Sequence, residues 1–199
     1  MKKIIISGFD PFDKMKINPS MEVVKELHTI AVDGAEIYPL ILPTVYGVSS
    51  EIVIEKIKEI KPDSIINLGL AGGRKKIFLE RFALNIDDAK TKDNKKIQRR
   101  GLLIAEDGPH AYASTLPVTD ILKQLHRYKI KAGISNFCGT FVCNHVMYST
   151  LHYIAKNNLP VTCGFIHLPK LSKGKNEVTV EKLLKAIKII ISFLVIDNE

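Results

Sequence analysis

The sequence of 199 residues has the length of one domain and the composition of an ordinary globular protein. Hydrophobic residues make up 46% and charged residues 25% of the chain, which excludes a disordered chain. The formal net charge of +8 permits a nucleic-acid partner but does not require one. The three cysteines form no CxxC pair, so we expect neither a disulfide scaffold nor a structural zinc site.

The apolar stretches of the sequence predict neither an export signal nor a membrane span. The run at residues 4–6 follows Lys2 and Lys3 but is too short for the apolar core of a signal peptide. The stretch at residues 185–199 is interrupted by Lys188 and reaches about half of a membrane span. We therefore expect a cytoplasmic protein with no membrane partner and with reduced cysteines.

Strand-like and helix-like segments alternate along the chain. Apolar, β-branched runs predict strands, and apolar residues at helical spacing predict helices. In chain order, we expect strands over residues 3–8, 35–42, 64–70, 77–86, 132–136 and 161–168, and helices over 20–31, 50–60, 118–128, 141–155 and 178–196. This alternation predicts a single α/β domain over residues 1–199, with three α/β/α layers around a twisted, mostly parallel central sheet.

Two segments depart from the regular pattern. Residues 87–100 are polar, irregular and basic, which indicates a solvated excursion or, as the alternative, a site for an acidic partner. They lack the interleaved aromatic residues that would stack on bases, so we expect no nucleic-acid partner. The last helix is apolar nearly all round, which predicts burial on two sides and therefore a subunit interface. The alternative is a hydrophobic end that merely closes the core.

Cys143 is a candidate nucleophile because of its place in the motif SNFCGTFVCNHVMY. A strand is predicted to end near Asn136, Gly139 permits a tight turn, and a helix begins near Phe141. Cys143 then lies in the first helical turn, where free N–H groups and the helix dipole favour a thiolate and lower a cysteine pKa. Cys138 and Cys163 are better read as packed core residues.

His167 is the histidine best placed to act as the base. It ends the strand predicted over residues 161–168, and in parallel α/β sheets the carboxyl ends of strands form the site. The turn before Cys143 also follows a strand end, so we expect the two residues to meet at one edge of the sheet. His145 lies two residues beyond Cys143 and faces about 200° away on a helix. His152 is also out of phase with Cys143. A structural histidine at position 167 stays the alternative.

Glu80 is the candidate for the acid that orients the base. At a period of two it shares one strand face with apolar residues such as Phe78 and Phe82, where an unpaired carboxylate is costly. A buried acid needs a partner, and an imidazolium is a good one. The alternative partner is a lysine or arginine from elsewhere. With Cys143 and His167, Glu80 completes a nucleophile, a base and an orienting acid.

Six sequence blocks carry a resemblance to pyroglutamyl-peptidase I, a family of cysteine peptidases. The blocks are GFDPFDKMKINPS (8–20), NLGLAGGR (67–74), LERFALNIDDAK (79–90), EDGPHAYASTLP (106–117), GTFVCNH (139–145) and GFIHLP (164–169). The resemblance implies hydrolysis of the N-terminal pyroglutamyl residue from peptides through a thioester. It also implies a homotetramer and a catalytic triad of Glu80, Cys143 and His167, with no metal or cofactor.

The resemblance further implies a substrate pocket with apolar walls, formed by Phe9, Phe12, Asn18, Phe141 and Val142. In this interpretation the phenylalanines flank the pyroglutamyl ring, while Asn18 and backbone groups meet its amide edges. Two further candidate substrate-binding residues depart from the family pattern. Leu70 replaces a usual glutamine, and Lys90 replaces a usual arginine that helps to stabilise the oxyanion. Lysine keeps the charge and loses the planar fork.

Two other functions compete with this prediction. The charge of +8 and the basic segment at residues 87–100 suit a nucleic-acid-binding module, which would bind with a steep salt dependence. The AGGR segment (71–74) suits a phosphorylase-like α/β enzyme, although the dinucleotide fingerprint and the Walker lysine are both absent from the sequence.

Overall fold

A six-stranded sheet with the strand order β2-β1-β3-β8-β4-β7 forms the centre of the structure. The computed structural model describes residues 1–174 and 177–196. In chain order the elements are β1 (Lys2–Phe9), α1 (Pro19–Glu26), a 3₁₀ turn (Leu27–Thr29), β2 (Ala35–Leu42), α2 (Val48–Ile60), β3 (Ser64–Leu70), β4 (Ile77–Glu80), β5 (Phe82–Leu84), β6 (Ala111–Ala113), α3 (Val118–Arg127), β7 (Ala132–Ser135), α4 (Val142–Lys156), β8 (Thr162–Leu168) and α5 (Val180–Val195).

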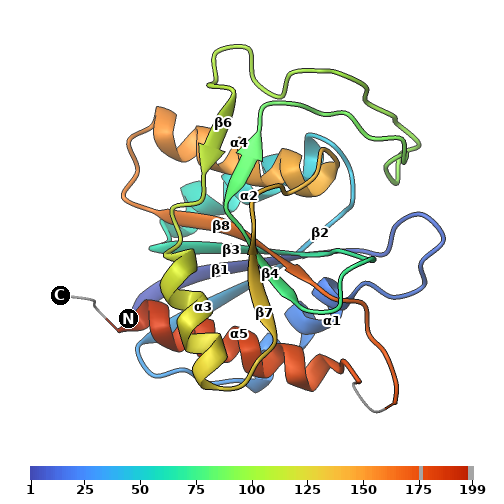
Figure 1. Cartoon of the computed structure of the whole chain (residues 1–199). Coiled ribbons are helices and arrows are strands. Elements are labelled where there is room, and N and C mark those ends of the chain that lie inside the picture. Colours follow the sequence, from blue (N-terminus) through green and yellow to red (C-terminus); the bar gives the residue numbers. More distant parts are fainter. Residues whose placement is uncertain (175–176, 197–199) are drawn as a thin grey trace.

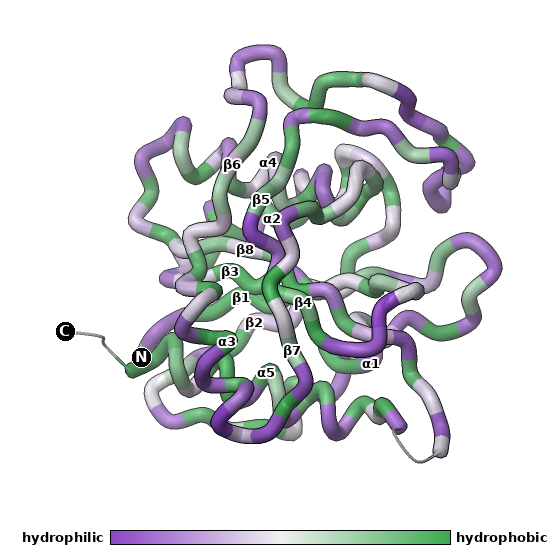
Figure 2. Tube along the Cα trace, in the orientation of Figure 1, coloured by the Kyte–Doolittle hydropathy of each residue, from purple (hydrophilic) through white to green (hydrophobic). Residues whose placement is uncertain are grey.

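Helices cover both faces of this sheet, as predicted. Figure 1 shows α2 and α4 on one face and α1, α3 and α5 on the other. Each face has its own cluster of buried apolar side chains, and Figure 2 shows the apolar residues concentrated in the strands between the two helical layers. Every residue of β3 is buried, which explains why its sequence is apolar without alternation. The predicted three-layer α/β fold is confirmed.

The direction of β4 and β7 differs from that of the other four strands. β4 pairs antiparallel with β8 and parallel with β7, whereas the pairs β1·β2, β1·β3 and β3·β8 are all parallel. The carboxyl ends of β7 and β8 therefore lie at opposite edges of the sheet. The prediction that these two ends meet at one edge is wrong, and residues 136–141 carry the chain back to the start of α4.

The prediction of a single strand over residues 77–86 is also wrong, because the chain passes from the central sheet to a second sheet at Arg81. The Arg81 amide donates to the Ser135 carbonyl of β7, while the Arg81 carbonyl accepts from Ser114 beyond β6. The following β5 pairs antiparallel with β6, a short strand that the sequence did not predict. Phe82 consequently lies in the second sheet and does not share a face with Glu80.

The segment at residues 87–100 is solvated only in part. Its lysines are exposed, as expected, but Asp87 and Asp93 are buried. Arg99 pairs with Asp87 at 2.8 Å, and Asp93 Oδ1 accepts the backbone amides of Lys95 and Ile97, each at 2.9 Å. The segment therefore folds around its own buried carboxylates.

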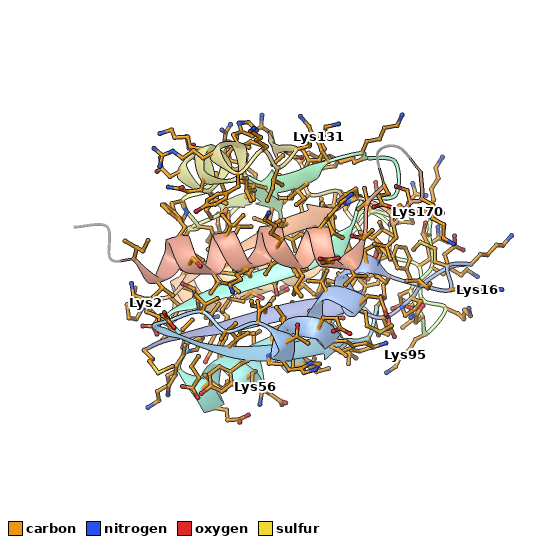
Figure 3. All side chains as sticks on the ribbon, turned by 90° about the horizontal axis from the view of Figure 1, so that it is seen from below. Lys2, Lys16, Lys56, Lys95, Lys131 and Lys170 are labelled. Atoms are coloured by element: carbon orange, nitrogen blue, oxygen red, sulfur yellow. The ribbon has the colours of Figure 1, made fainter. Side chains whose placement is uncertain are left out.

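The lysines labelled in Figure 3 do not gather on one side of the view. Lys2, Lys56, Lys131 and Lys170 lie toward different sides of the molecule. This distribution does not favour the nucleic-acid-binding alternative, which needs a continuous basic surface.

The last helix buries one face and half-buries much of the rest. Leu183, Ala186, Ile187, Ile190 and Ile191 of α5 are buried against the sheet and its neighbours. Lys185 and Lys188 are exposed. Within the described residues, the structure has no helix that is both long and apolar enough to cross a membrane.

Candidate active site

Cys143 occupies the second position of α4, as the sequence predicted. Gly139 adopts a positive φ of 85°, which turns the chain toward the helix without strain. Phe141 is the N-cap in an extended conformation and offers no side-chain cap. The first N–H groups of a helix have no intrahelical acceptor, so this end of α4 favours negative charge.

His167 and Cys143 lie on the same face of the central sheet. His167 of β8 stands directly beside Gly69 of β3 in a parallel register, so both residues project to the same side. A Cβ atom added to Gly69 would lie 3.2 Å from Cys143 Sγ. The absence of a side chain at Gly69 therefore leaves room for the thiol beside the imidazole.

Glu80 is fully buried and holds two partners on one oxygen. Glu80 Oε1 lies 2.8 Å from His167 Nδ1 and 3.0 Å from Arg74 Nη1. A carboxylate only accepts, so the proton of the neutral imidazole lies on Nδ1, which leaves the Nε2 lone pair free to act as a base. Both partners that the sequence left open, the histidine and an arginine, are present together.

The pKa of the Cys143 thiol is raised, whereas the sequence predicted a lowered pKa. Burial raises the pKa of Cys143 to about 12, and the charge of Glu80 adds to the rise, while the backbone N–H of Cys143 opposes it. The helix end alone does not overcome the loss of solvation. Burial likewise raises the pKa of Cys138 and Cys163, which are buried core residues as predicted.

The two histidines of α4 have structural partners. His145 Nδ1 lies 2.8 Å from Asp87 Oδ2, and its Nε2 accepts the Gly47 amide at 3.2 Å. His152 bonds the Tyr112 hydroxyl at 3.0 Å. These contacts fit the prediction that His145 and His152 point away from the Cys143 side chain.

Aromatic rings line the region in front of α4. The Phe12 and Phe141 ring centroids are 5.6 Å apart, and Tyr46 packs edge-on against Phe141 at 5.5 Å. Phe9 is buried and packs against Phe165, with the centroids 6.2 Å apart. Phe141 and the buried Val142 begin α4 immediately before Cys143.

The other predicted binding residues are Leu70, Lys90 and Asn18. Leu70 is the buried last residue of β3. Lys90 is exposed, and its carbonyl accepts from Gln98 at 3.0 Å. Asn18 is buried and caps α1: its Nδ2 donates to the Asp10 carbonyl at 3.0 Å, and its Oδ1 accepts from the amide and hydroxyl of Ser20. The Asn18 side chain thus holds the loop at residues 10–18 in place, and its predicted substrate contact stays a prediction.

Asp10 joins the loop at residues 10–18 to two other loops. Its Oδ1 accepts the Thr44 amide at 2.7 Å and Asn94 Nδ2 at 3.0 Å. Asn94 also donates to the Pro11 carbonyl. The loops after β1 and β2 and the segment at residues 87–100 therefore share one carboxylate.

Comparison with known proteins places this geometry in a family. The family model described as pyroglutamyl peptidase matches residues 2–195. The chain belongs to the pyroglutamyl peptidase family. A pyrrolidone-carboxylate peptidase of Brachyspira hyodysenteriae is 46% identical over 195 residues, which cover 95% of this chain and 96% of that protein. One from Thermoanaerobacter sp. is 48% identical over 169 residues, covering 85% of this chain and 83% of that protein.

Solved structures of the pyroglutamyl peptidase family share the whole fold. Pyroglutamyl peptidase I from Bacillus amyloliquefaciens has a TM-score of 0.92 at 36% identity, covering 98% of this chain and 95% of that chain. Pyrrolidone carboxyl peptidase from Pyrococcus furiosus has a TM-score of 0.90 at 37% identity, covering 96% and 97%. The prediction of a cysteine-type hydrolase of this family is confirmed, and family membership supports removal of N-terminal pyroglutamate.

Two residues at the site of this pyroglutamyl peptidase were not singled out by the sequence reasoning. Gly69 had no signal other than its place in the NLGLAGGR block. For Arg74 the sequence did offer a signal, because the buried Glu80 required either a histidine or a basic partner. Among the described residues, no group of three or more histidine, cysteine, aspartate or glutamate side chains could hold a metal ion.

Proposed function

We propose that this enzyme cleaves the bond after an N-terminal pyroglutamyl residue by means of a Cys143–His167–Glu80 triad. The observation that carries the proposal is the 2.8 Å contact between Glu80 Oε1 and His167 Nδ1, on the sheet face where Cys143 Sγ approaches Gly69. Glu80 orients the imidazole, and His167 Nε2 is the atom that exchanges protons with the thiol and the leaving amine.

In the proposed first step the Cys143 thiol starts protonated, because its pKa is raised. His167 Nε2 takes the proton from Cys143 as Sγ attacks the pyroglutamyl carbonyl carbon, so that charge separation accompanies bond formation. The carbonyl oxygen becomes an oxyanion, which the Cys143 backbone N–H stabilises together with Lys90 or its neighbourhood. The N-terminal end of α4 adds its dipole to this stabilisation.

The later steps return the enzyme to its resting state. The tetrahedral adduct collapses to a thioester as His167 Nε2 gives its proton to the departing amine. Water then attacks the thioester carbonyl while His167 accepts a proton from it. Collapse of this second adduct releases pyroglutamate, and the proton returns to Cys143 Sγ.

The aromatic walls suit the chemistry of the pyroglutamyl ring, a flat neutral lactam without a free α-amine. Phe12 and Phe141 are partly exposed and provide apolar surface. Phe9, Val142 and Leu70 are buried, so their contacts with the ring stay predictions. Asn18 and backbone groups are proposed to meet the amide edges. A site that pairs with the lactam carbonyl rejects proline, because its polar groups would stay unpaired.

The test is the release of a fluorescent amine from a pyroglutamyl amide, with the matching prolyl amide as the control substrate. Cys143→Ala is expected to abolish turnover with an unchanged circular dichroism spectrum, and Glu80→Gln to reduce turnover without abolishing it. Iodoacetamide is expected to inactivate the enzyme, and a chelator to leave it active. Full activity of Cys143→Ala, or equal cleavage of the prolyl amide, would refute the proposal.

We also propose that the enzyme is a cytoplasmic homotetramer in which α5 contributes to a subunit interface. The half-buried apolar residues of α5, which include Phe193 and Leu194, support this assignment. Analytical ultracentrifugation of the wild type and of Phe193→Asp tests it: a wild-type monomer at micromolar concentration would contradict it.

A further inference from the structure

The AGGR segment contributes an arginine to the catalytic region that the mechanism above does not use. We infer that Arg74 is a positioning residue that holds the Glu80 carboxylate in the orientation required by His167. The inference rests on the proposed function, since it assigns Arg74 to the same triad.

The Arg74 guanidinium is fixed on three sides. Nη1 donates to Glu80 Oε1 at 3.0 Å, and Nη2 donates to Ser135 Oγ at 3.1 Å. The guanidinium carbon lies 4.2 Å from the centre of the Phe78 ring. Ser135 Oγ in turn donates to the Phe137 carbonyl at 3.2 Å. The planar Arg74 guanidinium thus connects β4 to β7, and its partner on β4 is Glu80, the residue that contacts His167.

Glu80 depends on this contact because its two oxygens are not equivalent. Oε1 carries both the Arg74 and the His167 contacts, whereas Oε2 is buried and has no hydrogen-bond partner within residues 1–174 and 177–196. Without the guanidinium, a fully buried carboxylate would keep a single contact to an imidazole. Such a group is free to rotate, and its charge loses its nearest cation.

The same contacts explain the AGGR segment without a phosphate. The Arg74 amide closes a turn on the Ala71 carbonyl at 3.0 Å, and its guanidinium is already occupied by Glu80 and Ser135. Gly72 and Gly73 are exposed, and a Cβ atom at either would meet no heavy atom within 4 Å. The segment therefore serves to deliver the arginine to Glu80, and not to cradle a ligand.

Arg99 provides a matched control within the same chain. It pairs with the buried Asp87 at 2.8 Å, and Asp87 in turn contacts His145, which the mechanism does not use. The two arginine side chains are similarly exposed, 33% for Arg74 and 29% for Arg99. Each also lies over an aromatic ring. Both arginines therefore neutralise a buried carboxylate–histidine pair, but only one pair belongs to the triad.

The experiment compares Arg74→Ala, Arg74→Lys and Arg99→Ala in the intact enzyme by steady-state kinetics and thermal unfolding. Both alanine variants are expected to lower the melting temperature. Arg74→Ala is expected to lower kcat roughly ten- to hundredfold with little change in KM, whereas Arg99→Ala keeps kcat within about threefold. Arg74→Lys is expected to lie between, because one ammonium cannot reach Glu80 and Ser135 in the geometry of the fork.

Chemical rescue supplies a readout that a purely structural arginine would not move. Because Arg74 is partly exposed, millimolar guanidinium can enter the space left in Arg74→Ala and restore much of kcat, whereas urea cannot supply the charge. A kcat for Arg74→Ala within twofold of the wild type, or a folded variant that guanidinium does not restore, would overturn the inference.

Proton NMR separates failure of this inference from failure of the proposed function. The His167 Nδ1 proton is expected at low field in the wild type and in Arg99→Ala, and is expected to shift or disappear in Arg74→Ala. If the wild type fails to cleave pyroglutamyl amides, the proposed function is wrong and this signal alone decides the role of Arg74. An unchanged signal in Arg74→Ala would overturn the positioning role even in an active enzyme.

Discussion

Adding one methyl group at Gly69 tests whether the space between the thiol and the imidazole controls the chemistry. A Cβ atom there would lie 2.6 Å from Phe165 Cζ and 3.2 Å from Cys143 Sγ. Ordinary carbon contacts lie at about 3.5–4.0 Å, so the Phe165 ring must move by roughly 1 Å. That ring is buried between Phe9 and His167, with centroid distances of 6.2 and 4.8 Å, so its movement displaces the imidazole.

We expect Gly69→Ala to be folded, less stable and much less active. Overpacking of this kind costs about 1–3 kcal/mol, which for a chain of this size lowers the melting temperature by roughly 2–12 °C. A misplacement of 1 Å at reacting groups costs on the order of a hundredfold in rate. Calorimetry gives the first quantity, and kcat/KM for a pyroglutamyl amide gives the second.

Gly133→Ala is the control, because it adds the same methyl group to a buried position of β7. There the nearest atom is the terminal nitrogen of Lys76 at 2.8 Å, and that flexible end can move aside. We expect this variant to keep near wild-type stability and activity. If the two alanine variants behave alike in both measurements, the steric reasoning for Gly69 is wrong.

Three further predictions concern side chains near the thiol. Since the pKa of Cys143 is raised to about 12, alkylation by iodoacetamide should accelerate about tenfold per pH unit from pH 7 to 10, and a flat profile would indicate a resting thiolate. Tyr46 has a buried hydroxyl without a partner within the described ranges, so Tyr46→Phe should raise stability by about 1 kcal/mol in thermal unfolding; a loss would show that the hydroxyl is bonded. His145→Gln should lower the melting temperature and keep most of kcat, and a loss of turnover as large as that of Cys143→Ala would make His145 the base.

The raised pKa of Cys143 also makes the free energy of unfolding depend on pH. A thiol whose pKa is higher in the folded than in the unfolded protein stabilises the fold fully below its ordinary pKa. This contribution is lost as the pH rises toward the folded value of about 12. The free energy of unfolding of the wild type should therefore fall more steeply above pH 9 than that of Cys143→Ala, as urea titrations at several pH values can measure.

Local patterns predicted a strand well where a single apolar run is bounded by turn residues at both ends. The strands at residues 35–42 and 64–70 were predicted with the bounds that the structure has, because each is an apolar, strand-forming run. β3 is buried throughout, whereas β2 is an edge strand with one buried residue. The break at Arg81 was missed because the alternation of period two continues through it. Only the backbone partners of Arg81 on two different sheets end the strand, and those partners are distant in sequence.

The sequence predicted that Glu80 needs a partner, but it did not predict the direction of the Cys143 pKa shift. Glu80 was expected to need a cation because a buried carboxylate is costly, and the structure supplies His167 and Arg74 together. The protonation of Cys143 could not be predicted from helix position alone. It depends on how much water the packed fold removes from the sulfur, and on the charge of Glu80, which lies far from Cys143 in sequence.

The Asp10 carboxylate ties together loops that are distant in sequence through hydrogen bonds. The Asp10 side chain connects its own loop to two others, one of them 84 positions away in sequence. Displacing one of them by a long or bulky peptide would strain the other two. Tolerance for different residues downstream of the scissile bond should therefore vary with the length of the acid at position 10, which makes this position a natural starting point for altering peptide selectivity.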